Sequence, residues 1–96
     1  MQKSTSEEGW WRFLELCAAL KKPEQLGELF DLFLTIEEKE ALALRYLLIK
    51  ELLEEKRTQR QISADLRISI SKITRGSNAL KIISNQLREY LFTHMG

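Results

Sequence analysis

The segment from Gln59 to Asn78, QRQISADLRISISKITRGSN, restricts the fold more than any other part of this 96-residue chain. Two short helical patterns meet there at a tight junction, as in a helix-turn-helix unit. The apolar positions fall where two crossed helices must touch: Ile62, Leu66, Ile68 and Ile73. The polar positions are left to face outward: Arg60, Ser71, Lys72, Thr74 and Arg75. The segment therefore predicts an element whose outer surface can meet bases and phosphates.

Charge is sorted along the chain, although the net charge is only +1. From Glu7 to Lys56 there are twelve acidic and seven basic residues, a balance of −5. From Arg57 to Lys81 there are six basic residues and only Asp65 as an acid, a balance of +5. A locally basic element is typical of a phosphate-binding face, because a polyanion releases counterions on binding. An ordinary solvated basic surface is the alternative.

Capping and breaking residues predict helices throughout. Residues 1–8 are polar and are expected to form a flexible arm, followed by a helical pattern that Pro23 interrupts. After a short second helix, Thr35 with Glu38 forms a capping box that starts a third, from residue 36 to about residue 55. The leucines of this third helix cover more than one stripe, so it needs burial on several sides.

The rest of the chain divides at further helix starts. Three more N-caps are predicted: Thr58 with Gln61, Ser69 and Ser84. The helix-turn-helix then covers about residues 59–82 of a single all-α domain, residues 9–96, without any strand pattern. A chain this small buries a modest core by itself, so we expect it to share one with a partner chain.

Several classes of function are disfavoured. The single cysteine, Cys17, cannot form an internal disulfide, and no apolar stretch of secretory or membrane-spanning length occurs, so a cytoplasmic location and no membrane are expected. Cys17 and His94 have no neighbours that suggest metal binding or nucleophilic catalysis. We therefore expect neither a metal site nor catalytic residues, and no enzyme.

Four segments together resemble the bacterial Trp repressor family over nearly the whole chain: WWRFLEL, LTIEEKEALALRYLLIKELL, TQRQISADL and KITRGSNALK. The resemblance implies a six-helix, intertwined homodimer in which the first three helices and the last form a shared core. It also implies a transcriptional repressor of tryptophan-related genes, which binds operator double-stranded DNA with L-tryptophan as corepressor.

The resemblance assigns ligand roles by position. Arg45 and Arg75 match two arginines that hold the indole ring, and Arg75 also meets the carboxylate of the amino acid. A guanidinium group can stack on an aromatic ring and also pair with a carboxylate. Thr35 matches a hydroxyl that the partner subunit offers to the carboxylate, and Leu32 and Leu34 match backbone carbonyls that receive the ammonium group. Without the family, surface ion pairing is the better explanation of Arg45 and Arg75, and Thr35 is explained as an N-cap alone.

Two more positions complete the expected pocket. Gly76 matches the place where the ring edge passes close, and Ala79 stands where better-known members have a serine that helps hold the amino group. Because Ala79 lacks that hydroxyl, the alternative is a dimeric helix-turn-helix regulator that responds to another aromatic ligand or to none. A helical interaction module without nucleic acid is a third reading, which the basic segment disfavours.

The resemblance also assigns the DNA contacts. Gln59 and Arg60 match the start of the first motif helix, where the family contacts the backbone and a guanine. The N-terminal turn of the reading helix supplies four more positions: Ile70, Ser71, Lys72 and Thr74. Lys81 matches a phosphate contact, with a solvated helix lysine as the alternative. Lys72 replaces a threonine, so the operator sequence does not carry over.

The turn itself departs from the family pattern. Arg67 replaces the usual glycine between the two motif helices. If the backbone keeps a positive φ there, a residue with a side chain is strained by about 1 kcal/mol. We therefore expect the turn to be softer or differently bent.

Overall fold

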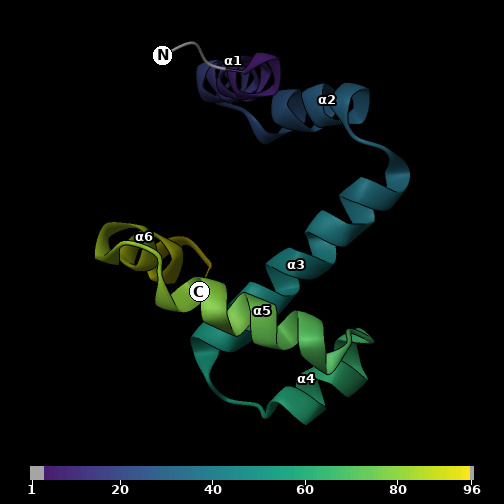
Figure 1. Ribbon diagram of the computed structural model, residues 1–96, viewed down its shortest axis with the longest axis vertical. Helices are drawn as coiled ribbons and strands as arrows, with labels where there is room; N and C mark the ends of the chain where they lie inside the picture. Colours follow the sequence, from purple (N-terminus) through teal and green to yellow (C-terminus); the bar gives the residue numbers. More distant parts are fainter. Residues whose placement is uncertain (1–3, 96) are drawn as a thin grey trace. The chain divides into compact units, whose positions relative to one another are not determined.

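The computed structural model describes residues 4–95, and the regular structure of this part is entirely helical (Figure 1). Its elements are α1 (Thr5–Ala19), α2 (Pro23–Phe33), α3 (Ile36–Glu54), α4 (Gln59–Leu66), α5 (Ile70–Lys81) and α6 (Asn85–Met95). Contacts within the chain divide it into two compact units, Met1–Lys39 and Glu40–Gly96, with the boundary inside α3. The predicted all-α fold with six helices is confirmed.

The helix starts follow the predicted capping residues. All four predicted N-caps are present: Thr35, Thr58, Ser69 and Ser84. At the start of α3, the Thr35 N–H donates to Glu38 Oε1 at 2.8 Å and the Glu38 N–H donates to Thr35 Oγ1 at 3.1 Å. These bonds satisfy backbone donors that lack partners within the helix. The boundaries are therefore set by short-range sequence.

The start of α1 requires a correction. The predicted flexible arm covered residues 1–8, but α1 begins at Thr5. Ser4 accepts a hydrogen bond from the Glu7 N–H through its Oγ at 3.1 Å, and Glu7 Oε2 accepts from the Ser4 N–H at 3.3 Å. This capping box extends the helix over polar residues, of which Glu7 and Glu8 are good helix formers and Thr5 and Ser6 are not. Residues 1–3 lie outside the described residues.

The first unit has little interior. Neither α1 nor α2 contains a buried side chain. Phe13 packs its ring against Phe30 and Phe33, with ring centroids 5.9 and 5.1 Å apart. Leu16 and Leu32 nevertheless expose 50% and 79% of their surface. The apolar side chains of this unit touch one another and still leave a broad apolar surface.

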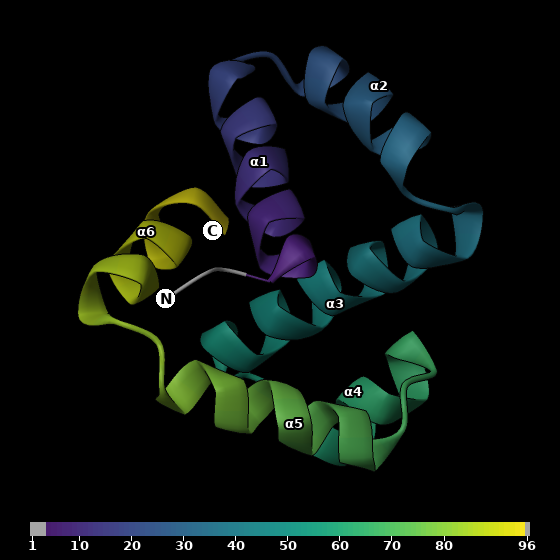
Figure 2. The ribbon, with the colours of Figure 1, turned by 45° about the horizontal axis from the view of Figure 1, so that its top comes forward.

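The second unit has a small, well-packed core. Its buried members come from α3, α4, the turn and α5: Leu48, Ile62, Ile68 and Ile73. Leu52 and Leu66 pack against them and are half-buried. Figure 2 shows α4 and α5 beside the second half of α3. The predicted contact of Ile62, Ile68 and Ile73 is confirmed, with Leu66 at its edge.

Helix α3 is only partly covered in a single chain. Leu48 and Leu53 are buried. Leu42, Leu44 and Leu47 expose between 40% and 53% of their surface. The apolar residues spread around this helix thus include a set that the second unit does not cover by itself.

Candidate nucleic-acid interface and ligand residues

The turn between α4 and α5 is held in a defined shape by Ser63. Arg67 has φ 54° and ψ 45°, which is the left-handed region, and its N–H donates to the Ser63 carbonyl. The Ile68 N–H donates to the same carbonyl at 3.3 Å, while Ser63 Oγ donates to the Ile68 carbonyl at 2.6 Å. Residue 67 thus has the positive φ at which a residue with a side chain is strained. Sequence analysis missed the part played by Ser63.

Arg57 connects the end of α3 with the end of α4. Its Nε donates to Glu51 Oε2 at 3.0 Å, and its Nη1 donates to Asp65 Oδ2. The hydrogen bond to Glu51 is the main cause that raises the pKa of Arg57 above its usual value. Because Arg57 engages Asp65, the one acid of the basic segment is already paired within the fold. No local pattern predicts this bridge, since its three residues are spread over 15 positions.

Five cations of the basic segment remain after Arg57 is set aside, and all are exposed: Arg60, Arg67, Lys72, Arg75 and Lys81. Among residues 4–95, the ion pairs involve none of these five. An uncompensated group of cations on short, rigid helices favours a polyanion. The second unit thus presents a positive surface that its own acids do not neutralise.

The predicted DNA residues occupy exposed positions at helix starts. Gln59 and Arg60 are the first two residues of α4. The four predicted reading residues lie in the first five positions of α5 and are exposed: Ile70, Ser71, Lys72 and Thr74. Ile70 exposes 47% of its surface, and an aliphatic side chain there can contact a thymine methyl group. Lys81 is exposed at the other end of α5.

The predicted ligand residues of the second unit lie on α3 and α5. Arg45 and Arg75 are exposed, and Ala79, one turn after Arg75, is half-buried. Gly76 is buried, and a Cβ placed on it would lie 3.2 Å from Leu48 Cδ2. The absence of a side chain at Gly76 therefore lets α5 approach α3 closely. This packing explains the glycine without any ligand.

The predicted ligand residues of the first unit lie where α2 ends. Leu32 is the penultimate residue of α2 and Leu34 follows its last. Carbonyls at a helix end lack donors within the helix and carry its partial negative charge, which suits an ammonium group. Thr35 Oγ1 accepts from the Glu38 N–H, so its own hydrogen stays available for a carboxylate. These positions offer complementary groups for both ends of a free amino acid.

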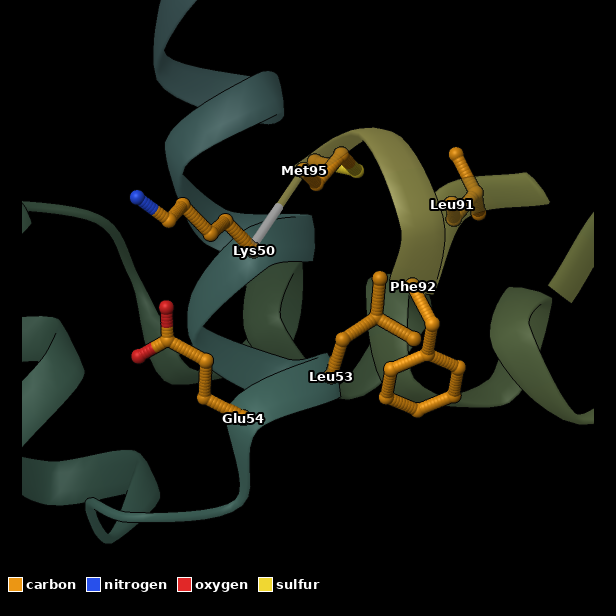
Figure 3. A pocket seen from close by; sticks show the side chains of 6 residues that line it. All are labelled: Lys50, Leu53, Glu54, Leu91, Phe92 and Met95. Atoms are coloured by element: carbon orange, nitrogen blue, oxygen red, sulfur yellow. The ribbon is translucent and has the colours of Figure 1, made fainter. Parts of the chain in front are cut away.

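Two pockets of the second unit were considered for a ligand. Figure 3 shows a cavity of about 40 Å³ between α3 and α6, with these lining residues: Lys50, Leu53, Glu54, Leu91, Phe92 and Met95. A second cavity of about 160 Å³ is lined by Leu52, Leu53, Glu55, Ser77, Leu80, Lys81, Arg88 and Phe92. Small-molecule sites usually enclose about 300–1,000 Å³. Both cavities are smaller, and neither is lined by Arg45 or Arg75.

Other kinds of site were sought in the same part of the chain. Within residues 4–95, no group of three or more His, Cys, Asp or Glu side chains is placed to hold a metal ion. None of the six helices is both long enough and apolar enough to span a membrane, as far as the described residues go.

Comparisons with known proteins point in the same direction. A family model described as "Trp repressor protein" matches residues 8–95. A Trp operon repressor homolog of Chlamydia caviae is 47% identical over 91 residues, which are 95% of this chain and 90% of the relative. One from Chlamydia trachomatis serovar D is 46% identical over 89 residues, covering 93% and 95%. One from Mannheimia succiniciproducens is 35% identical over 94 residues, covering 98% and 93%.

Proposed function

This chain belongs to the Trp repressor family, and we propose that it represses tryptophan-related genes by binding operator DNA as a homodimer with L-tryptophan as corepressor. One observation carries the DNA-binding part of the proposal. Arg57 engages Asp65, and five exposed cations of the same segment stay unpaired among the described residues. A surface of this kind gains affinity for DNA through counterion release.

The two motif helices divide the work on DNA. Arg60 near the start of α4 can bind a guanine through two hydrogen bonds, which supplies sequence discrimination. The hydroxyl groups of Ser71 and Thr74 can hold phosphates or bridging waters, and Lys72 adds a phosphate contact. Gln59 touches the backbone from the start of α4, and Lys81, the last residue of α5, does the same. Specificity thus rests on few residues and affinity on many.

Tryptophan is held by charge and stacking. The guanidinium groups of Arg45 and Arg75 are exposed and free of ion pairs among the described residues, so they can enclose an indole ring. Arg75 also pairs with the carboxylate. Thr35 of the partner subunit donates its hydroxyl hydrogen to the same carboxylate, and the Leu32 and Leu34 carbonyls accept from the ammonium group. The ligand site is then completed only by two chains.

Ligand and DNA are coupled because α5 serves both. Its first turn carries the reading residues, and Arg75 follows directly after Thr74. Gly76 brings the same helix against Leu48 of α3, so α5 moves as part of a packed body. Tryptophan raises operator affinity to the extent that it binds more tightly when α5 has the DNA-competent placement.

Dimerisation is supported by uncovered apolar surface. Helices α1 and α2 bury no side chain, and α3 leaves Leu42, Leu44 and Leu47 exposed. Soluble monomers rarely expose apolar surface on several consecutive helices. A second copy of the chain would cover these helices, and folding and association would then be one process.

A different ligand is the second candidate, because of Ala79. Its methyl group cannot give the hydrogen bond that a serine would offer to the amino group. The site would then favour an aromatic acid without an amino group, or the chain would bind DNA without any ligand.

Titration calorimetry with L-tryptophan tests the corepressor assignment. We expect one binding event per chain in the parent and none in Arg75→Ala, because this arginine meets both the ring and the carboxylate. Arg12→Ala removes an exposed arginine from α1 and serves as the matched control, with unchanged binding expected. Heat with indole-3-carboxylic acids but not with L-tryptophan would support the second candidate instead.

A mobility-shift assay on sites selected from a random DNA pool tests the reading residues. Arg60→Ala should reduce discrimination among sequences by about 1–3 kcal/mol, if its guanine contact has two hydrogen bonds. Its tryptophan binding should equal that of the parent. An Arg60→Ala variant that selects the same sequences with the same preference would refute this role.

A further inference from the structure

The turn between α4 and α5 carries a charged residue in a backbone conformation that suits glycine. Arg67 has φ 54°. Glycine adopts this region without steric cost, whereas a residue with a Cβ adopts it only at a steric cost. The Arg67 side chain makes no ion pair among residues 4–95 and is exposed. Nothing within the described chain therefore compensates for having arginine at this position.

We propose that Arg67 is an additional phosphate-binding residue, which grips the DNA backbone from the turn beside the reading helix. This inference rests on the proposed DNA binding of α4 and α5. It adds a phosphate contact at a position where the family usually has glycine. Because glycine has no side chain, the resemblance assigns no side-chain role to this position.

The placement of Arg67 suits such a contact. It lies two residues before Ser69, the N-cap of α5, and three before Ile70, the first residue of that helix. When the first turn of α5 faces base edges in a groove, the preceding turn lies close to a flanking phosphate row. Phosphate contacts of this kind fix the orientation of the protein and carry no sequence preference.

The turn is also rigid enough to aim the side chain. Both the Arg67 and the Ile68 N–H groups donate to the Ser63 carbonyl, and Ser63 Oγ donates to the Ile68 carbonyl. Ile68 itself is buried in the core. The side chain of Arg67 therefore extends from a fixed backbone. Binding a phosphate then costs only the conformational entropy of that side chain.

Local charge favours a phosphate over an internal partner. The acid nearest in sequence, Asp65, is engaged by Arg57. Arg57 also holds Glu51, so this bridge engages one acid of α3 and one of α4. Arg67 is thereby left with the other unpaired cations of the segment.

The salt dependence of DNA binding tests the proposal. In Arg67→Asn the charge is lost but the left-handed backbone is tolerated, because asparagine adopts that region readily. A homodimer carries two copies of Arg67, so the slope of log affinity against log salt should become shallower by about 1.8, the value for two phosphate contacts. Between 50 and 200 mM salt, the parent should therefore lose roughly 12-fold more affinity than the variant. The loss of affinity at low salt should be equal on all sequences.

Three further proteins complete the experiment. Arg67→Lys should keep the parent slope, because it keeps the charge. Arg67→Gly should have the same slope as Arg67→Asn, which shows that the change comes from the lost charge and not from the asparagine. Arg12→Asn removes the same charge from α1 and should keep the parent slope. Parental slopes in both Arg67→Asn and Arg67→Gly would overturn the inference while DNA binding stands. A parent that shows no salt-dependent DNA binding would overturn the proposed function as well.

Discussion

The helix-turn-helix core and the N-terminal helices both contain large apolar side chains, but only the helix-turn-helix core buries them. Around α4 and α5, Ile62 and Ile73 are 1% and 0% exposed. In α1 and α2, which are also rich in large apolar side chains, no residue is buried. The first region thus has a buried core of its own, whereas the second has none.

This difference separates two demands on one small chain. The DNA-reading unit needs a fixed geometry, and it obtains one from its own core, the Ser63 turn and the Arg57 bridge. The N-terminal helices instead present apolar surface, which gives free energy only when another surface covers it. In the proposed dimer, each chain therefore builds its own DNA-reading unit. The two chains are joined through their N-terminal helices, whose apolar surface the partner covers.

A charge placed on the N-terminal helices should have the largest effect. Leu16→Lys puts an ammonium group on an α1 side chain that is 50% exposed in one chain. If the partner covers Leu16, association should weaken by about 3–5 kcal/mol, the cost of an uncompensated buried charge. Sedimentation equilibrium measures this change.

The control for Leu16→Lys is its neighbour. Glu15→Lys adds a lysine at an exposed polar position of the same helix, so association should stay close to that of the parent. Equal dimer stability in Leu16→Lys and the parent would remove α1 from the interface and break the comparison between the two regions.

The core of the second unit is tested by two isoleucines of α5. Ile73→Ala should lower the free energy of unfolding by about 2–5 kcal/mol, because it opens a cavity in a fully buried cluster. Ile70→Ala, at a position that is 47% exposed, should change it by less than about 0.5 kcal/mol. Urea denaturation at fixed protein concentration gives both values. Equal losses would mean that Ile70 is covered by something outside the single chain.

The smallest effect on the free energy of unfolding is expected from the capping boxes, which begin a helix in each of the two regions. Thr58→Ala removes the capping box of α4 and should cost about 1 kcal/mol, since α4 anchors Ile62 in the core. Ser4→Ala removes the capping box of α1 and should cost less in global unfolding, because fraying of that first turn exposes no buried side chain. Denaturation curves of the two variants, measured together, show the ranking. A larger loss for Ser4→Ala would indicate that the start of α1 is itself buried in the assembly.

Local features of the fold could be predicted from the sequence, because their causes lie within a few residues. Thr35 and Thr58 cap helices through hydrogen bonds to residues three positions away. The contact of Ile62 with Ile73 follows from helical spacing alone.

The missed features depend on tertiary contacts or on weaker local signals. Arg57 joins Glu51 to Asp65 across two helices, and no spacing rule links these three positions. The resemblance assigned Gly76 to the ligand, whereas its packing on Leu48 appears only when α3 and α5 are placed. The early start of α1 had a local sign, the Ser4 and Glu7 pair, which the polar composition of this stretch obscured. The ligand and DNA residues stay predictions, since they describe contacts with molecules other than this chain.

The order of the helices has a consequence for how the protein is made. During synthesis, α1 and α2 leave the ribosome before α4 and α5. The helices that bury no side chain of their own therefore emerge first. If the proposed dimer forms, their apolar side chains, such as Leu32, are open to nonspecific association until a second chain covers them. The rate at which copies meet, and not only the stability of the folded unit, would then set how much functional protein a cell obtains.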